Sequence, residues 1–136
     1  MLGFIVADTT VVVDNQILHK PVDFADNVRM VGFLANRTHE VMTRFCVERQ
    51  DGVAHTETVT TQVSVRSLSG PEIEGYATSG EGADKAGGYA IQGLGSFAVT
   101  GIQGSYTNVV GLPASELVSA LLALGLLPSF PLPAIR

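Results

Sequence analysis

Residues 38–66, THEVMTRFCVERQDGVAHTETVTTQVSVR, contain two long runs in which apolar and polar side chains alternate. The first run spans residues 38–48 and the second spans residues 53–66, with Gln50-Asp51-Gly52 between them. Alternation with a period of two is typical of a strand with one buried face, and Asp-Gly between two such runs favours a turn. The stretch therefore predicts a long antiparallel β-hairpin with one apolar face.

The segment before this hairpin predicts a shorter hairpin and then a helix. Residues 3–13 are rich in β-branched side chains and predict a strand, Asp14-Asn15-Gln16 predicts a turn, and Ile17-Leu18 leads back. From Asp23, a suitable N-cap, to Asn36, a suitable stop, the apolar spacing becomes helical. The apolar residues at this spacing are Phe24, Val28, Val31 and Ala35. We expect this face of the helix to lie on the sheet.

The segment after the long hairpin predicts two more helices and a strand. A short helix starts at the N-cap Ser69 and ends before Ser79, a strand covers residues 97–102, and a last helix covers residues 114–124. The chain is therefore expected to be an α/β protein with a long, largely antiparallel or mixed sheet and helices packed on it. Residues 128–136 are rich in proline and are expected to form an extended or disordered tail.

The composition suits one domain with an unusually apolar surface. Of the 136 residues, 15% are charged where about 25% is usual, and 46% are apolar before the 15 glycines are counted. Such a chain is expected to cover part of its surface with a second subunit or with further polypeptide. A homodimer is one such arrangement.

Net charge and cysteine content exclude several classes of protein. The net charge is −5 and there is no basic run, which argues against binding to a nucleic-acid polymer but leaves a mononucleotide open. The single cysteine, Cys46, excludes an internal disulfide and is expected to be a buried thiol between Phe45 and Val47. No basic segment precedes Leu2, and the apolar run at residues 117–127 is too short to span a bilayer. The expected location is the cytoplasm, without membrane contact.

Residues 84–93, DKAGGYAIQG, are mostly small or polar, so they are poorly suited to a hydrophobic core and well suited to a surface that approaches a ligand closely. Glycine leaves main-chain N–H groups uncovered, so phosphate oxygens can come near them, and Lys85 adds a positive charge. The alternative is an ordinary glycine-rich turn. Composition alone leaves both open.

Five motifs occur in order along the chain, and together they resemble one protein family. They are Val6 to Val13 with its Ala-Asp-Thr, Lys20-Pro21, His39 to Thr43, Asp84 to Gly93, and Gly104 to Pro113. This pattern resembles the Maf family of nucleoside triphosphate pyrophosphatases, also called septum formation inhibitor proteins. The resemblance implies an elongated Maf/ITPase-like sheet with helices packed on it, over residues 1–127.

The resemblance also implies an activity. Such enzymes hydrolyse a nucleoside triphosphate between the α- and β-phosphates, with a divalent cation, Mg²⁺ or Mn²⁺. The form of Asp84 to Gly93 resembles the branch that acts on dTTP and UTP. The chain is thus expected to be a hydrolase of nucleotide metabolism.

Asp8 is the candidate catalytic base and metal ligand. It interrupts an apolar strand, where a buried carboxylate without a partner is destabilising and favours a cation nearby. The alternative from the residues alone is a capped turn or a strand end facing water. The resemblance implies the catalytic role, because Asp8 matches the acid of the Ala-Asp-Thr motif.

Three further residues match nucleotide-binding positions of the family: Lys20, Lys85 and Gln92. The lysines suit phosphate charge, and the amide suits a hydrogen bond to the base or to the attacking water. Asp84 is either a second metal-binding carboxylate or the partner that orients Lys85. Zinc is not expected, because the histidines lack metal-ligand spacing and His39 begins a strand, where exposed polar residues are routine.

Two further residues, Ser105 and Asn108, are expected to have structural roles in a turn. The family pattern begins with a Ser-x-Ser-Pro-Arg-Arg motif, which this sequence does not contain. The chain is therefore expected to be an N-terminally truncated member with part of the phosphate-binding set. One hypothesis is a pyrophosphatase weakened by truncation, and the alternative is a non-catalytic nucleotide-binding or dimer-forming remnant. A third hypothesis is a misplaced start codon, in which case the real protein is longer and fully active.

Overall fold

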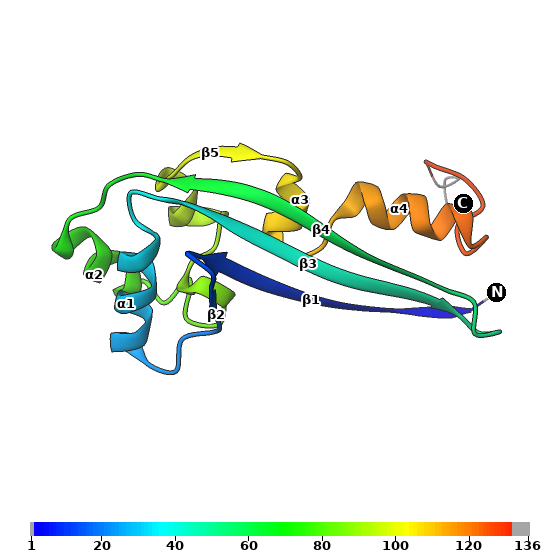
Figure 1. The fold of residues 1–136 in the computed structure, drawn as a ribbon, viewed down its shortest axis with the longest axis horizontal. Helices are drawn as coiled ribbons and strands as arrows, with labels where there is room; N and C mark the ends of the chain where they lie inside the picture. Colours follow the sequence, from blue (N-terminus) through cyan, green and yellow to red (C-terminus); the bar gives the residue numbers. More distant parts are fainter. Residues whose placement is uncertain (1, 132–136) are drawn as a thin grey trace, which may run out of the picture.

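Five strands form one sheet in the order β2-β1-β3-β4-β5, and every neighbouring pair is antiparallel (Figure 1). The structure is a computed structural model that describes residues 2–131. The strands are β1 (Gly3–Val13), β2 (Gln16–Leu18), β3 (Thr38–Arg49), β4 (Ala54–Val65) and β5 (Val99–Gln103). Of the two sheet types left open by the sequence, the antiparallel one is observed.

The long hairpin predicted from residues 38–66 is confirmed. Strands β3 and β4 pair from Thr38 opposite Ser64 to Glu48 opposite Ala54, so nearly the whole length of both strands is hydrogen bonded. Alternate residues of β3 are buried from His39 to Val47, as the period-two pattern requires. This hairpin runs along the longest axis of the molecule, which is horizontal in Figure 1.

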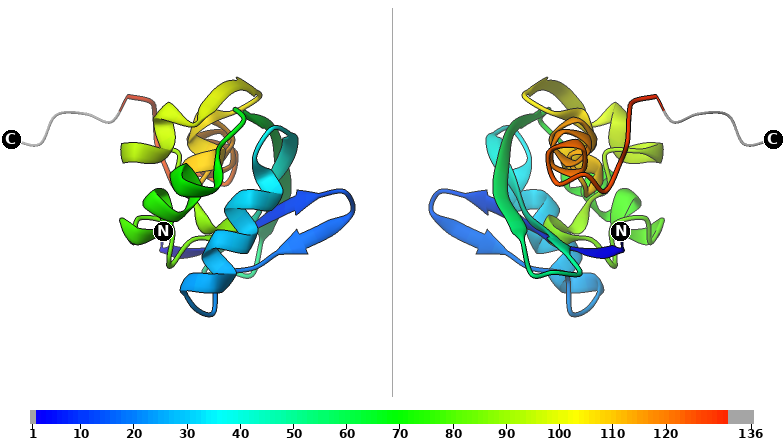
Figure 2. Two further views of the ribbon diagram at one scale, coloured as in Figure 1. Left: turned by 90° about the vertical axis from the view of Figure 1, so that its left-hand side faces the viewer. Right: turned by 90° about the vertical axis from the view of Figure 1, so that its right-hand side faces the viewer.

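The helices are α1 (Phe24–Leu34), α2 (Gly70–Thr78), α3 (Tyr106–Val110) and α4 (Ala114–Ala123), with two short 3-10 turns, η1 (Ala86–Gly88) and η2 (Gly93–Phe97). Helices α1 and α2 lie at one end of the sheet, and α4 extends toward the other end, on the same side of β3 and β4 (Figures 1 and 2). None of the helices within residues 2–131 is long and apolar enough to cross a membrane.

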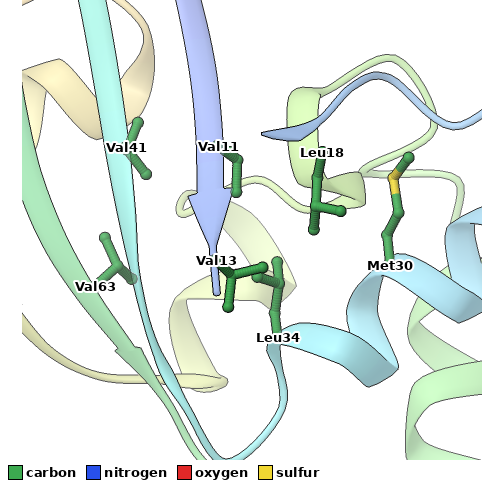
Figure 3. Close-up of a cluster of buried hydrophobic side chains, with 7 residues drawn as sticks. All are labelled: Val11, Val13, Leu18, Met30, Leu34, Val41 and Val63. Atoms are coloured by element: carbon green, nitrogen blue, oxygen red, sulfur yellow. The ribbon is translucent and has the colours of Figure 1, made fainter. Parts of the chain in front are cut away.

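One face of the sheet carries both hydrophobic clusters. The first joins β1, β2, β3 and β4 to α1 (Figure 3), and its members are Val11, Val13, Leu18, Met30, Leu34, Val41 and Val63. The second joins Phe45 and Val47 of β3 to Ala120 of α4 and to Leu124, which caps that helix. Both clusters use odd-numbered residues of β3, so the even-numbered face has no helix on it within the described residues.

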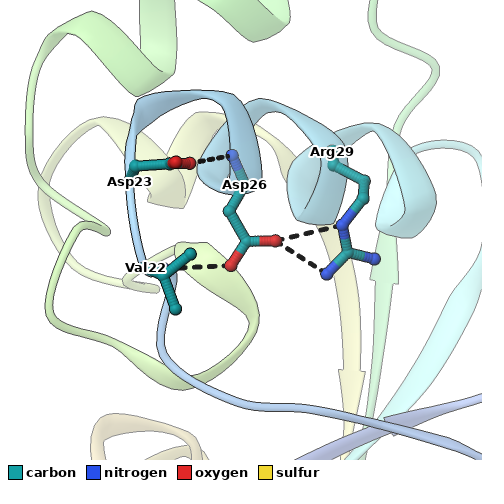
Figure 4. Close-up of polar contacts among 4 residues, drawn as sticks. All are labelled: Val22, Asp23, Asp26 and Arg29. Atoms are coloured by element: carbon teal, nitrogen blue, oxygen red, sulfur yellow. Dashed lines mark hydrogen bonds and ion pairs between the residues drawn. The ribbon is translucent and has the colours of Figure 1, made fainter.

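Helix α1 begins where the sequence predicts, but it buries a different face. The Asp23 carboxylate accepts a hydrogen bond from the N–H of Asp26 at 2.8 Å, and Asp26 in turn pairs with Arg29 (Figure 4). Of the predicted apolar residues, Val31 is buried, Val28 and Ala35 are half-buried, and Phe24 is exposed. The other buried residues of this helix are Asn27, Met30 and Leu34. The face is rotated because Asn27 makes a buried hydrogen bond that a search for apolar residues does not count.

The segment from residue 97 to residue 113 also differs from the prediction. Strand β5 begins at Val99, because Phe97 ends the η2 turn and its side chain is 74% exposed. Residues expected as a turn form helix α3, with the Ser105 hydroxyl accepting a hydrogen bond from the N–H of Asn108. Ser105 and Asn108 thus have the structural roles expected of them.

Strand β1 is an edge strand over most of its length. Strand β2 pairs only with Val11 to Val13, so within the described residues Gly3 to Thr10 have a neighbour on the β3 side alone. The side chains of Phe4, Ile5 and Val6 are 54%, 45% and 58% exposed. An unpaired, apolar edge favours association with another strand.

The division of the chain into a domain at residues 1–127 and a tail at residues 128–136 stays a prediction. Residues 128–131 contain no helix or strand, and the rest of the expected tail lies outside the described residues.

Candidate functional site

A cavity of about 520 Å³ lies between β1, the segment after β2, the glycine-rich stretch and the end of α3. The polar residues proposed from the sequence for catalysis or binding all line it: Asp8, Lys20, Asp84, Lys85 and Gln92. Its other walls are mainly apolar, with Val11, Val41, Ile91, Val109 and Val110 among them. The fold therefore brings together polar residues from three separate segments at one cavity.

The glycine-rich stretch is fixed against β1 and the segment that carries Lys20. The N–H of Gly87 donates a hydrogen bond to the carbonyl oxygen of His19 at 3.1 Å. Gly87 has a φ of 79°, and a Cβ there would lie 3.1 Å from the Val11 methyl groups, so only glycine suits the position. This bond places Lys85 and Lys20, each close in sequence to one of the bonded residues, on the same cavity.

The two central glycines do not offer their N–H groups to a ligand. The N–H of Gly87 is bonded to His19, and the N–H of Gly88 donates to the carbonyl oxygen of Lys85 at 3.0 Å. The carbonyl oxygen of Gly88 accepts a bond from the buried Asn27 side chain at 2.8 Å. At these two positions, of the two readings that composition left open, the glycine-rich turn is observed, and the glycines serve close packing.

Asp8 lies in the middle of β1, neither at a turn nor at a strand end, and it is exposed. The reason is that its register with Arg44 places it on the even-numbered face of the sheet, which has no helix on it within the described residues. Asp8 lies opposite Arg44 on β3, yet within residues 2–131 its carboxylate makes no hydrogen bond or ion pair. It is one of the residues that line the cavity, together with Lys20 and Lys85.

The lysines of the sequence number two, Lys20 and Lys85, and both line this cavity. Lys85 Nζ lies 3.7 Å from the Asp84 carboxylate, and both side chains are largely exposed. An exposed pair at this distance stabilises little and leaves the ammonium free to bind a stronger anion. This geometry favours the partner role for Asp84 over a metal-binding role.

Glu81, which the sequence analysis did not single out, holds the segment that follows Gln92. Its carboxylate accepts hydrogen bonds from the N–H groups of Leu94 and Gly95, each at 2.9 Å, and from the Tyr76 hydroxyl at 2.9 Å. Burial raises the pKa of Glu81, but these three donors together bring that pKa below its ordinary value. The Tyr76 hydroxyl also accepts the N–H of Ala90 at 3.0 Å, so α2 is tied to both flanks of Gln92.

We expect Glu81→Gln to lower the free energy of unfolding by about 1.5 kcal/mol, because an amide NH₂ would face a backbone N–H that now has an acceptor. Urea unfolding measures this change. Glu74→Gln is the matched control, since Glu74 is exposed on α2 and its carboxylate makes no hydrogen bond within the described residues. Equal stabilities for the two variants would contradict the role assigned to Glu81.

His39 is buried, with a side chain 1% exposed, instead of lying on an exposed strand end as the sequence suggested. Its Nε2 lies 2.6 Å from the hydroxyl oxygen of Tyr89, and the two rings meet edge to face. Burial lowers the pKa of His39 to about 4 and raises the pKa of Tyr89 above its ordinary value. Both side chains are therefore neutral at pH 7.

The neutral state of His39 predicts a loss of stability in mild acid. Between pH 6.5 and about pH 4 the unfolded chain binds a proton at this histidine and the folded chain does not, so stability falls as pH falls. The loss over this window is on the order of 3 kcal/mol. Urea unfolding at pH 7, 5.5 and 4.5 measures it, and His39→Gln is expected to flatten the profile. Parallel profiles for the two proteins would refute this explanation.

The cavity suits a divalent cation that is shared with a substrate, and not a preformed metal centre. Within residues 2–131 there is no group of three or more histidine, cysteine or acidic side chains that could hold a metal ion. Asp8 and Asp84 are the carboxylates in the cavity wall. Mg²⁺ is commonly bound by one or two carboxylates together with substrate phosphates and water, and this donor set fits that arrangement.

Comparisons with known proteins identify a family that this chain matches. Residues 3–124 match the family described as Maf-like protein. A dTTP/UTP pyrophosphatase from Sphingopyxis alaskensis is 47% identical over 119 residues, which are 88% of this chain and 63% of the relative. The dTTP/UTP pyrophosphatase from Vibrio cholerae is 53% identical over 110 residues, which are 81% of this chain and 58% of the relative.

A third relative, the dTTP/UTP pyrophosphatase from Syntrophotalea carbinolica, is 48% identical over 123 residues, which are 90% of this chain and 56% of the relative. The chain thus spans between 56% and 63% of the length of these three curated relatives. The family match nevertheless covers nearly all of the chain, from the first strand to the last helix. This chain belongs to the Maf family.

Proposed function

We propose that the chain forms the nucleotide-binding and hydrolytic part of a pyrophosphatase that acts on dTTP and UTP. The observation that carries the proposal is the meeting of Asp8, Lys20, Lys85 and Gln92 at one cavity. The names of the three relatives support the choice of substrates. The products would be the nucleoside monophosphate and pyrophosphate.

Asp8 is proposed to be the general base. A water oxygen attacks the α-phosphorus, the bond from that phosphorus to the bridging oxygen breaks, and the proton of the water passes to the Asp8 carboxylate. An exposed carboxylate without a protein partner can accept this proton, since no hydrogen bond has to be broken first. Pyrophosphate leaves with the bridging oxygen.

Lys20 and Lys85 are proposed to bind the phosphates, and Gln92 to bind the base or to orient the water. The negative charges of Asp8 and Asp84 offset the positive charges of the two lysines, so the cavity lining has little net positive charge with which to bind a triphosphate. A bound Mg²⁺ or Mn²⁺, held by Asp8 and the phosphates, would supply charge neutralisation. The lysines orient the phosphate chain so that the α-phosphorus faces the water at Asp8.

Two measurements test the proposal. The first is the release of pyrophosphate from UTP and dTTP with Mg²⁺ or Mn²⁺. The second is the acylation of lysine side chains, which mass spectrometry detects. Because both lysines line the cavity, UTP is expected to protect each from acylation. Protection without release would favour the alternative of a non-catalytic nucleotide-binding protein. A folded chain that shows neither release nor protection would overturn the proposed function.

We also propose a homodimer, and the cytoplasm as its location. The open apolar edge of β1 supports self-association, because two copies can pair there through backbone hydrogen bonds. Val6→Lys places a charge on this edge and is expected to shift the protein to a monomer in light scattering. Gln62→Lys, on an exposed position of β4 that has a paired strand on both sides, is the control. A monomeric wild-type protein would contradict the proposed dimer.

A further inference from the structure

Tyr89 separates the candidate site from a second cavity. The residue lines the 520 Å³ cavity, whose lining also includes Lys85 and Gln92. It also lines a cavity of about 200 Å³ between α1, α2, η2 and the start of β5. That second cavity is largely apolar, with Val31, Leu34, Leu68 and Val99 in its wall. Tyr89 thus borders both the candidate site and an apolar cavity.

A single polar contact holds the Tyr89 side chain in this position. Its hydroxyl lies 2.6 Å from His39 Nε2, and it makes no other hydrogen bond within residues 2–131. The ring centroids are 5.3 Å apart with the planes at 83°, so the imidazole also packs edge to face on the phenol. The other ring nitrogen of His39 is buried without a partner. Within the described residues, the His39 side chain therefore has Tyr89 as its single hydrogen-bond partner.

The lining of the cavity includes both polar and apolar side chains. Lysines and carboxylates suit the phosphates, which leaves the apolar wall that includes Tyr89, Ile91 and Val109 for the base. A wall that can retreat into a neighbouring cavity would admit a larger base. A fixed wall restricts the site to a smaller one.

We propose that His39 is a positioning residue that fixes Tyr89 as the wall between the two cavities and so favours pyrimidine over purine nucleotides. The inference rests on the proposed function, because it concerns the nucleotide of that same site. Loss of the His39–Tyr89 hydrogen bond lets the ring tilt into the apolar cavity that it borders. The site then widens and its discrimination against purines falls.

The test compares the dissociation constants of non-hydrolysable α,β-methylene analogues of UTP and GTP. The proteins are the wild type, Tyr89→Phe, His39→Leu and His39→Gln. The preference for the UTP analogue is expected to fall about fivefold in Tyr89→Phe and His39→Leu, the change that loss of one buried hydrogen bond supports. His39→Gln can still bond the Tyr89 hydroxyl and is expected to restore most of the preference.

Urea unfolding of the same four proteins separates positioning from a merely structural role, which would lower stability without changing the ratio of the two constants. An unchanged ratio in folded Tyr89→Phe would overturn the inference and leave the proposed function in place. A wild-type chain that binds neither analogue would overturn the proposed function, and the inference with it.

Discussion

Asp8→Asn is expected to release pyrophosphate from UTP at least about 100-fold more slowly than the wild type. Asparagine has nearly the same shape as aspartate and can still accept a hydrogen bond from water, but it cannot take a proton at neutral pH. The effect should appear in kcat, because the lysines that are proposed to hold the phosphates are unchanged. Lysine acylation should still be prevented by UTP in this variant.

Stability should not change in Asp8→Asn, since the exposed carboxylate makes no hydrogen bond or ion pair within residues 2–131. Asp14→Asn provides a matched control on the turn that follows the same strand, where it removes an exposed ion pair with Arg37 and should leave activity intact. A rate for Asp8→Asn within threefold of the wild type would remove Asp8 from the proposed mechanism.

Asn108→Ala is expected to destabilise the fold by about 3 kcal/mol. Asn108 is fully buried, and its side-chain nitrogen lies 3.1 Å from the Val41 carbonyl oxygen and 3.0 Å from that of Val59. The same nitrogen lies 3.0 Å from the Thr61 hydroxyl, which also bonds to Ser105. Alanine would leave these acceptors short of a donor and would open a cavity between α3 and the sheet.

Urea unfolding of Asn108→Ala should show a lower midpoint with an unchanged slope. Gln62→Ala is the comparison, because Gln62 is exposed on the helix-free face of β4 and should change stability by less than about 0.5 kcal/mol. If the two variants unfolded at the same urea concentration, the buried amide would have no part in joining α3 to β3 and β4.

The elements that the sequence predicts well are those whose signals are local. The alternation in residues 38–66 indicates strands without reference to the rest of the chain. An N-cap such as Asp23 or Ser69 likewise acts within one turn of its own helix. The Ser69 cap is complete, with Glu72 returning a hydrogen bond to its backbone. Except for the pairing within the hairpin, these interactions join residues that are at most four positions apart in the sequence.

The features that the sequence misses depend on partners far along the chain. Asn27 is buried on α1 because it bonds Gly88, which lies 61 residues away. His39 is buried because Tyr89 covers it, 50 residues away. Asp8 is exposed because its pairing with Arg44, 36 residues away, places it on the side of the sheet without helices. Cys46 is only half-buried, contrary to expectation, because it faces the side of the sheet without helices.

The candidate site follows the same division. Each of its predicted residues was found from a short motif, yet nothing in those motifs says that Lys20 and Lys85 share a cavity. That proximity depends on the bond between Gly87 and His19. Glu81 gives no pattern of its own, because an acid between two glycines is ordinary in a loop. Its role becomes visible only when the N–H groups of Leu94 and Gly95 are found on it.

The anchoring of the glycine-rich stretch by His19, Asn27, Tyr76 and Glu81 has a thermodynamic consequence. Glycine loses more backbone freedom than other residues when it is ordered, and here that loss occurs on folding and not when a ligand arrives. Binding at this stretch would therefore carry a small entropic penalty for ordering the protein. Calorimetry of nucleotide binding would then report the release of water and the phosphate contacts, with little signal from the ordering of a loop.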